Sequence, residues 1–209
     1  MTVRELTVGR IQRDERPAVI GALTRAFYND PLFEFFLPNQ VHQTKGALAF
    51  MAAALTDAEP FGDVWVARAG GEVASAAVWL PPAGYPRSRK RDLMTVVRGF
   101  PAFIHSGVRA LASLRLLNEV DRVHHEVGIP HYYLAVLGTD PLFRRIGAAS
   151  AALQPVLERC DEEGLPAYLE TQREENLAFY ARHGFELQRM LDIRGVPPLW
   201  TMLRNPRSG

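Results

Sequence analysis

The sequence has a single cysteine, Cys160, among its 209 residues. One cysteine excludes an intramolecular disulfide and any metal site built from several cysteines. The chain also lacks a run of about 18 uninterrupted apolar residues, so no segment is expected to cross a bilayer. Residues 1–17, MTVRELTVGRIQRDERP, contain no apolar stretch typical of a signal peptide. We therefore expect a cytoplasmic protein with no membrane partner.

An excess of charge of either sign is also missing. There are 24 basic and 23 acidic residues, for a formal net charge of +1. This balance gives no reason to expect a nucleic acid as a partner. The absence of G-x-x-x-x-G-K-[ST] argues against a P-loop NTPase, and the absence of G-x-G-x-x-G argues against a dinucleotide-binding fold.

What is present is the composition of an ordinary globular protein, with 47% hydrophobic and 22% charged residues. The length fits a single domain covering 1–209. Gly70-Gly71 predicts a tight hairpin turn between two strands. The predicted strands cover 3–11, 62–69, 72–80, 131–139, 167–171, 185–194 and 199–203.

The predicted helices follow from periodicity and from capping residues. Asp14 is expected to cap a helix that runs to about 28, and Thr171 with Glu174 has the spacing of a capping box for a helix ending at about 183. Gly164 is expected to end a helix over about 145–163, which Pro155 should kink. A further alanine-rich helix is predicted over about 40–58.

A helical insert of about residues 83–127 separates the third and fourth predicted strands. An insert of this size is expected to cover a site. Its basic run, residues 87–91, could contact a phosphate or form solvated surface. We expect no metal site at His124, His125 and His131, because adjacent histidines on a helix point in different directions and no ligand spacing flanks them.

Most of the functional information lies in residues 131–185, where the pattern is strand, turn, helix, strand, helix. The turn and helix start comprise Arg144–Ala149, with the sequence RRIGAA. A helix N-terminus has unpaired amide N–H groups and about half a positive charge, and can therefore bind a phosphate. Small residues let the phosphate approach the backbone, and the two arginines add charged donors. Taken alone, such a turn is a weak signal, because a glycine before a helix is more often only a tight turn.

Two motifs at their mutual spacing resemble the GCN5-related N-acetyltransferase (GNAT) family. The first is [QR]-x-x-G-x-[GA] at Arg144–Ala149, and the second is N…Y…GF at Asn176, Tyr180 and Gly184-Phe185. From Tyr132 to about residue 205 the chain is most similar to the puromycin N-acetyltransferase branch, through LET at 169–171 and the segment NLxFYxRxGF. Residues 3–80 resemble the family only loosely.

The resemblance implies an α/β GNAT fold: a central mixed, mostly antiparallel, twisted sheet of six to seven strands flanked by helices, with the helical insert between the third and fourth strands. It implies acetyl-CoA as acetyl donor, no metal, and a binding core over about 131–185. The pantetheine arm would pair with the strand backbone at Leu137 and Thr139, and an N–H near Leu137 would polarise the thioester carbonyl. The implied acetyl-CoA-binding residues are Leu137, Gly138, Thr139, Arg144, Arg145, Ile146, Gly147, Ala148, Ala149 and Asn176.

Tyr180 is the implied general acid that protonates the departing thiolate. An ordinary thiol titrates near about 8.5 and a tyrosine near about 10, so this transfer is uphill by about 2 kcal/mol unless the site assists. The alternative is that Tyr180 is a buried aromatic packed on the sheet.

Glu170 is the candidate general base, because the acceptor amine must lose a proton. Keeping a lysine-like amine neutral at pH 7 costs about 4.6 kcal/mol, whereas an α-amine costs about 1 kcal/mol. Glu170 is alternatively an exposed strand-end carboxylate or a partner for an arginine. Weaker candidate bases are Asp30, Glu34, His125 and His131.

The expected function is acetylation of a primary amine on a small molecule, such as an antibiotic or a metabolite, by direct attack. The insert would close a pocket lined by Phe33, Phe35, Phe36 and Tyr85. The alternatives are a protein lysine or N-terminal acetyltransferase and a non-catalytic acetyl-CoA-binding module. The chain is expected to act as a monomer or a homodimer.

Overall fold

A computed structural model describes residues 5–37, 39–84 and 110–207. Seven strands form one sheet in the order β1-β2-β3-β4-β5-β7-β6. All neighbouring strands are antiparallel except β4 and β5, which are parallel. This mixed, mostly antiparallel sheet confirms the predicted fold. The strands are β1 Leu6–Arg10, β2 Val64–Ala69, β3 Glu72–Leu80, β4 Tyr132–Thr139, β5 Ala167–Thr171, β6 Glu186–Leu191 and β7 Leu199–Arg204.

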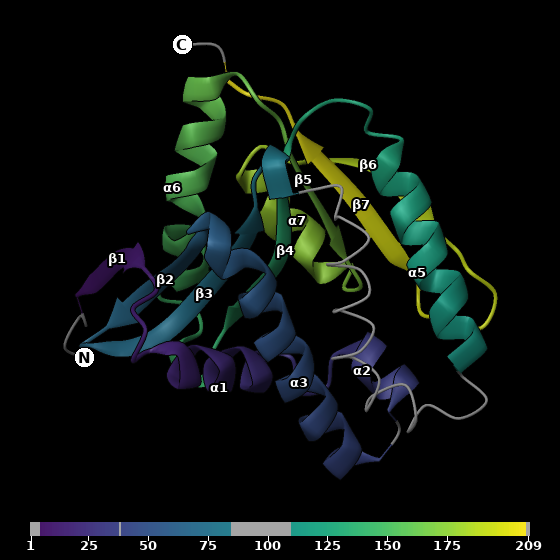
Figure 1. Cartoon of the computed structure of the whole chain (residues 1–209), viewed down its shortest axis with the longest axis horizontal. Coiled ribbons are helices and arrows are strands. Elements are labelled where there is room, and N and C mark those ends of the chain that lie inside the picture. The colour runs from purple at the N-terminus through teal and green to yellow at the C-terminus, as the bar shows by residue number, and fades with distance from the viewer. Residues whose placement is uncertain (1–4, 38, 85–109, 208–209) are drawn as a thin grey trace.

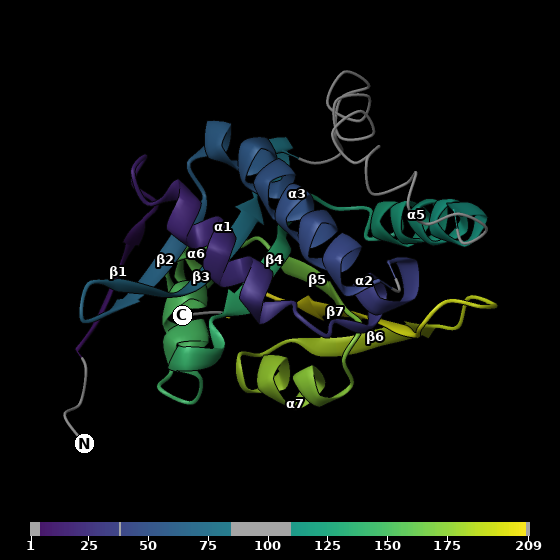
Figure 2. The same ribbon diagram turned by 90° about the horizontal axis from the view of Figure 1, so that it is seen from below.

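Helices cover both faces of the sheet. Figures 1 and 2 show α1 and α3 on one face, α6 and α7 on the other, and α5 beside the β6–β7 end. Because both faces are covered, β3 is a nearly continuous apolar run rather than an alternating one. The helices are α1 Arg16–Ala26, α2 Pro31–Phe36, α3 Gln40–Ala58, α5 Ala110–His125, α6 Ala148–Glu163 and α7 Glu175–Arg182, with short 3₁₀ turns at η1 Glu59–Phe61, η2 Pro82–Gly84 and η4 Pro141–Phe143.

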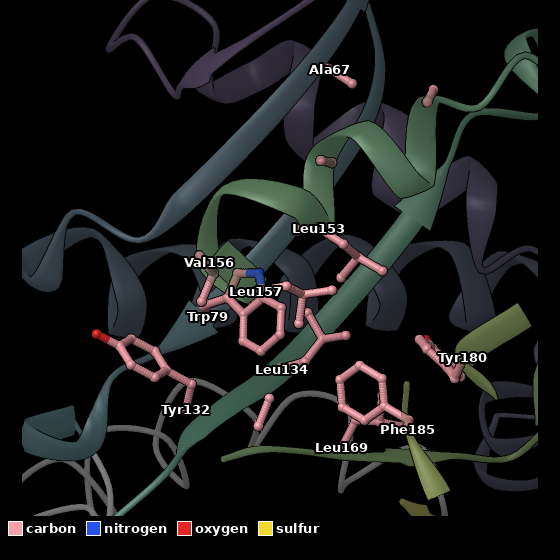
Figure 3. Packing of buried hydrophobic residues seen from close by; sticks show 14 of the residues in the cluster. Ala67, Trp79, Tyr132, Leu134, Leu153, Val156, Leu157, Leu169, Tyr180 and Phe185 are labelled. Atoms are coloured by element: carbon pink, nitrogen blue, oxygen red, sulfur yellow. The ribbon is translucent and has the colours of Figure 1, made fainter. Parts of the chain in front are cut away.

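Each face of the sheet has its own hydrophobic core. On the α6 side, Trp79, Leu134 and Leu153 pack with Leu169 and Phe185 (Figure 3). On the α1 and α3 side, the core is built from a different set, which includes Leu23, Met51, Leu55, Val78 and Val136. Each such side chain stabilises the fold by about 1.5–3 kcal/mol when fully buried.

β4 contains a bulge that changes which of its residues face each core. Val78 pairs with Val136 and the next β3 residue, Trp79, pairs with Leu134, so Ala135 is the extra residue of β4. A bulge of this kind reverses the side-chain alternation along the strand. Leu134 therefore faces α6, whereas Val136 faces α1 and α3.

Several predicted boundaries are wrong, for conformational reasons. α6 begins at Ala148 rather than near 145, because Arg145 and Gly147 adopt left-handed φ values of 65° and 83° that a right-handed helix excludes. α1 is preceded by Glu15 rather than Asp14 as its N-cap. The capping box predicted at Thr171 is absent, because Glu174 is the N-cap of α7 and its side chain makes no capping bond.

The predicted chain reversals are confirmed. Gly70 and Gly71 adopt φ values of 61° and 83° at the β2–β3 hairpin. Gly164 ends α6 with a φ of 65° and donates its N–H to the last turn. Both are positions where a residue with a Cβ would be strained.

The helical insert is described only in part. α5 is its second portion, and it follows β3 and precedes β4 as predicted. The basic run at 87–91 and Tyr85 lie outside the described residues. Among the helices that the structure does describe, none has the length and apolar character needed to cross a bilayer.

Candidate active site

The two strands at the centre of the sheet separate after a short parallel pairing. β4 and β5 pair only through Tyr132–Leu134 against residues 167–169. Past Leu134, the edge of β4 that faces β5 has no paired strand in the described part of the chain. An extended ligand could add to this edge as a strand does.

The backbone groups at this open edge belong to Leu137 and Thr139. Asp140 donates its backbone N–H to the carbonyl of Ala74 at 2.9 Å, and thereby fixes which residues of β4 bond to β3. Alternate residues direct their backbone groups to opposite sides, so those of Leu137 and Thr139 point away from β3. These are the positions at which the sequence predicts pantetheine pairing.

Gly138, between them, has a packing role. A Cβ at this position would lie 2.8 Å from Leu23 Cδ2 and 3.0 Å from Ala26 Cβ. The glycine thus lets α1 lie directly against β4. Its own carbonyl accepts a hydrogen bond from Ser75 Oγ at 2.8 Å, on the β3 side of the strand.

The turn after β4 is anchored by a buried aspartate. Asp140 is 1% exposed, and its carboxylate accepts hydrogen bonds from Arg25 Nε and Nη2 at 2.8 and 2.6 Å. The same carboxylate accepts from the N–H of Leu142 and caps η4. Through these contacts Asp140 attaches the turn to α1 and also fixes the backbone of the turn at Leu142.

The turn leads into a helix end without a side-chain cap. Gly147 is the N-cap of α6, no acidic residue lies in the first turn, and the first helical hydrogen bond runs from Ala151 N–H to the Gly147 carbonyl. The N–H groups of Ala148, Ala149 and Ser150 precede that bond, as the amides at a helix start always do. The left-handed Arg145 and Gly147 arrange successive amides into the kind of concave turn that binds anions.

Side chains around this helix end leave it open and positively charged. A Cβ at Gly147 would meet no atom within 4 Å. Arg144, Arg145 and Ile146 are exposed, and neither arginine forms an ion pair within the described ranges. The turn can therefore hold a phosphate without first breaking an existing contact.

α7 places Tyr180 in the core on the α6 side. The Tyr180 ring contacts Phe179 and Phe185 edge-on, with centroid separations of 5.2 and 5.8 Å (Figure 3). Burial raises the pKa of Tyr180 above its usual value. The phenol is therefore protonated at neutral pH and can donate a proton but not accept one.

Asn176, at the start of the same helix, secures the β5–α7 connection. Its amide donates to Thr171 Oγ1 at 3.1 Å, and this hydroxyl also accepts from the N–H of Arg173 at 3.4 Å. Thr171 thus organises the turn before α7 instead of capping the helix.

Glu170 lies on the opposite face of β5 from Tyr180. Its neighbour Leu169 belongs to the core that contains Tyr180, and successive strand residues face opposite sides. The Glu170 side chain is 6% exposed, and its Oε1 lies 3.8 Å from Nδ1 of His124. The prediction of an exposed carboxylate is therefore wrong, and the structure adds His124, which sequence reasoning did not propose for catalysis.

The other candidate bases occupy different positions. Asp30 accepts a hydrogen bond from the N–H of Leu32 as the N-cap of α2, and burial raises its pKa. Glu34 is exposed. His125 faces solvent, with its Nδ1 bonded to the carbonyl of Asp121 at 2.7 Å, whereas His131 is buried beside His124. The opposite orientations of His124 and His125 follow the predicted helix geometry.

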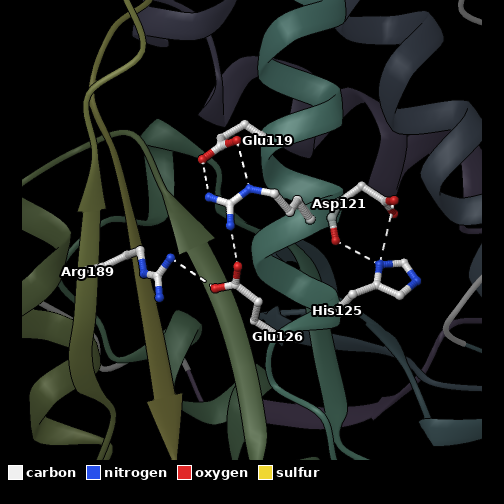
Figure 4. A network of polar contacts seen from close by, with 6 residues as sticks. Glu119, Asp121, His125, Glu126 and Arg189 are labelled. Atoms are coloured by element: carbon white, nitrogen blue, oxygen red, sulfur yellow. Dashed lines mark hydrogen bonds and ion pairs between the residues drawn. The ribbon is translucent and has the colours of Figure 1, made fainter.

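α5 packs beside the face of the sheet that carries Glu170. Leu116 and Val123 pack with Phe35 and Phe36 of α2 and with Leu191 and Leu199 of the β6–β7 end. Arg122 bridges Glu119 and Glu126. Glu126 also pairs with Arg189 of β6 at 3.0 Å, and Figure 4 shows these two side chains. Of the predicted apolar lining, Phe35 and Phe36 adjoin α5, whereas Phe33 packs with Phe27 and Phe50 near α3.

Within the described ranges, no group of three or more His, Cys, Asp and Glu side chains is arranged to hold a metal ion. His124 and His131 approach one another closely, but their nitrogens face each other rather than a shared ligand position. Among the described residues, the candidate site includes backbone amides, arginines, a tyrosine and a buried carboxylate.

Solved structures with this architecture include a Corynebacterium glutamicum protein described as histone acetyltransferase HPA2 and related acetyltransferase. It has a TM-score of 0.67 and 21% identity, with 98% of each chain covered. A polyamine N-acetyltransferase from Drosophila melanogaster, which forms N-acetylagmatine, has a TM-score of 0.57 and 16% identity, with 96% of this chain and all of that chain covered (100%). At such identities the likeness establishes the fold alone.

The sequence comparisons bear on the family. An N-acetyltransferase of Schizosaccharomyces pombe is 32% identical over 81 residues, which is 37% of this chain and 32% of that protein. The chain thus spans about a third of the length of this curated relative. The sequence profile of the acetyltransferase (GNAT) family matches residues 25–185, a range that runs from Arg25 of the turn anchor to Phe185 behind Tyr180. The chain therefore belongs to the GNAT family of acetyltransferases.

Proposed function

We propose that this protein transfers the acetyl group of acetyl-CoA to a primary amine of a small molecule. The observation that carries the proposal is the continuity of the open β4 edge with the uncapped N-terminus of α6. An unpaired strand edge that leads directly into an anion-binding helix start fits a ligand with an extended amide arm and a pyrophosphate. Acetyl-CoA would supply the activated thioester.

The donor site would be formed by residues of β4, the turn and α6. The backbones of Leu137 and Thr139 would hold the arm, and an N–H near Leu137 would stabilise the carbonyl oxygen. Arg144, Arg145, Ile146, Gly147, Ala148 and Ala149 would form the pyrophosphate site. Asn176 would bind the arm once its bond with Thr171 is exchanged, or would act only by fixing the start of α7.

Tyr180 would donate a proton to the sulfur that leaves. Its raised pKa makes this transfer more uphill than between ordinary groups, so a thiolate formed in the same desolvated environment is required. Glu170 would remove a proton from the amine on the other side of β5, directly or through water. Glu170 and Tyr180 lie on opposite faces of the sheet. This arrangement fits a reaction in which the amine loses a proton on one side and the sulfur gains a proton on the other.

The position of α5 against α2 supports the choice of a small amine. The two helices would limit the space beside Glu170 in which the acceptor binds. The Drosophila relative is a polyamine N-acetyltransferase, whereas the Corynebacterium relative is described as a histone acetyltransferase. A protein acetyltransferase is therefore the alternative, and a non-catalytic acetyl-CoA-binding module is the second. Within the family we propose the puromycin N-acetyltransferase-like branch, in a cytoplasmic domain spanning 1–209.

The test is a panel of amines incubated with acetyl-CoA, with thiol release followed spectroscopically. The panel should contain polyamines, arylalkylamines, an aminonucleoside and lysine-containing peptides. We expect release that depends on a small amine, and loss of about 10²-fold in kcat for Tyr180→Phe with acetyl-CoA affinity retained.

Tyr132→Phe is the matched control, because Tyr132 is also a buried core tyrosine but its hydroxyl bonds Glu163 at 2.9 Å. A Tyr180→Phe enzyme as fast as wild type would remove the acid assignment. Release with peptides alone would favour the first alternative, and acetyl-CoA binding without any acceptor-dependent release would favour the second.

A further inference from the structure

A buried series of polar groups joins β5, α5 and the start of β4. His124 Nδ1 lies 3.8 Å from Glu170 Oε1, and His124 Nε2 lies 2.7 Å from His131 Nε2. His131 Nδ1 lies 2.7 Å from the carbonyl oxygen of Ile129. The groups thus follow one another in the order Glu170, His124, His131 and the Ile129 carbonyl.

The carbonyl at one end determines the tautomers of both rings. A carbonyl only accepts, so His131 must carry a proton on Nδ1. Burial lowers the pKa of His131, so its ring is neutral near pH 7 and its Nε2 is an acceptor. His124 must then donate from Nε2. The nitrogen of His124 that can gain or lose a proton is therefore Nδ1, which faces Glu170.

The surroundings keep this proton site away from bulk water. The side chains of His124 and Glu170 are 2% and 6% exposed. The rings of Tyr133 and Tyr168 lie 4.5 and 4.7 Å from the His124 ring, measured between centroids. Among the described residues, the titratable groups that face His124 include Glu170 and Tyr168 of β5, Tyr133 of β4, and His131. The His124 imidazole and the Glu170 carboxylate are 3.8 Å apart, which is beyond hydrogen-bond distance but close enough for protonation of one to affect the other.

We propose that His124 is a positioning residue that makes Glu170 and His124 a single proton acceptor for the amine. An ordinary carboxylate titrates near about 4.3 and an imidazole near about 6.5, and a base works best when its pKa is close to the working pH. The imidazole thus lets the pair retain a proton that an isolated carboxylate would release.

This inference rests on the proposed function. As the N–C bond forms and the C–S bond breaks, the amine nitrogen gives one proton to the Glu170–His124 pair. Tyr180 donates one proton to the sulfur. Afterwards the pair releases one proton to solvent and Tyr180 regains one, so the protons balance.

The first test needs no substrate. In ¹⁵N-labelled free protein near pH 7, ring-nitrogen shifts should show His131 protonated on Nδ1 and His124 protonated on Nε2, with His124 Nδ1 titrating. In Glu170→Gln that titration should move. A neutral His124 with its proton on Nδ1, or a titration unchanged in Glu170→Gln, would overturn the proposal.

The second test is kinetic. His124→Gln keeps a hydrogen-bonding amide but no titrating nitrogen, and we expect it to lower kcat/KM for the amine about 10²-fold while acetyl-CoA affinity is retained. The acid limb of the pH profile should lose the ionisation seen at Nδ1. His125→Gln, on the solvent face of α5, should match wild type. A His124→Gln enzyme with an unchanged rate and profile contradicts the inference alone.

The design separates failure of the variant to fold from failure of the proposed function. A melting temperature identifies a His124→Gln protein that fails to fold, and in that case the wild-type and Glu170→Gln titrations decide. A wild-type protein that acetylates no amine overturns the proposed function and the catalytic role of the pair with it, whatever the ring-nitrogen shifts show.

Discussion

The proposed donor half and the proposed acceptor half of this site are built differently. The donor half is a nearly contiguous piece of chain, from β4 through the turn and α6 to α7. The acceptor half brings together Phe35 and Phe36 of α2, His124 of α5, His131 before β4 and Glu170 of β5. The first is held mainly by local backbone geometry, and the second by contacts between distant segments. Changes in the acceptor half should therefore leave donor binding intact, while the reverse need not hold.

The largest expected effect comes from a change at Glu170, which tests whether acetyl-CoA binding is independent of the acceptor half. Glu170→Gln preserves shape and removes the proton-accepting oxygen, and we expect kcat/KM for the amine to fall by about 10²- to 10⁴-fold. Acetyl-CoA affinity, measured by calorimetry, should stay near the wild-type value. Glu174→Gln, at an exposed position of the next turn, is the matched control. A parallel loss of acetyl-CoA binding would show that the halves are not separable.

A second change tests the point where α1 meets the donor strand. In Gly138→Ala the new methyl group would lie 2.8 Å from Leu23 Cδ2 and 3.0 Å from Ala26 Cβ. Overpacking of this kind costs about 1–3 kcal/mol, and each kcal/mol lowers Tm by about 2–4 °C for a chain of this size. Thermal unfolding measures the effect.

The control for this change is Gly9→Ala, because a Cβ at Gly9 of β1 meets only the end of Arg68 at 3.5 Å. We expect its stability to change by less than about 0.5 kcal/mol. Equal melting temperatures for the two variants would contradict the close packing of α1 on β4.

A smaller effect is expected at the exposed arginines of the turn. Arg144→Ala should weaken acetyl-CoA binding by about 2- to 5-fold, the range of about 0.4–1 kcal/mol typical of exposed charge pairs. The difference should shrink in high salt, because screening weakens exposed interactions. Calorimetry at two salt concentrations measures both. Arg189→Ala, on the α5 side of β6, should bind as wild type does; a salt-independent loss at Arg144 would argue against a phosphate contact.

The last prediction concerns the pH dependence of stability and His131 of the acceptor half. Burial lowers the pKa of His131. Below about pH 6.5 the unfolded chain therefore binds more protons at this site than the folded protein, so stability falls as pH falls, by at most about 1.4 kcal/mol per pH unit. Urea unfolding between about pH 5 and pH 7.5 should show this loss reduced in His131→Gln. The remaining dependence includes His183, whose pKa is also lowered by burial and by Arg182. Identical slopes in wild type and variant would exclude a contribution from His131.

The sequence predicted the chain reversals well because their signals are local. Gly70, Gly71 and Gly164 have left-handed conformations that their positions between apolar segments indicate. The motif at Arg144–Ala149 and Tyr180 marked one contiguous unit. The exact start of α6 was missed because nothing in the residue type of Arg145 signals a left-handed φ.

The acceptor half could not be predicted to the same depth. His124 and His125 are adjacent and chemically identical in sequence, and only the packing of α5 buries one and exposes the other. The bulge at Ala135 depends on the register with β3, which no local pattern specifies. Contacts such as His124 to Glu170 join residues that come together only once the sheet is complete.

The open edge of β4 also has a consequence for self-association. A strand edge at the border of a sheet is a template on which other chains can pair and aggregate. Here the unpaired segment lies on the fourth strand of seven, and β5, β7 and β6 follow it on the same side. The unpaired edge therefore lies inside the sheet and not at its border. A thin, unbranched ligand can enter between β4 and β5. A strand of another protein molecule could pair along this edge only after displacing β5, β7 and β6.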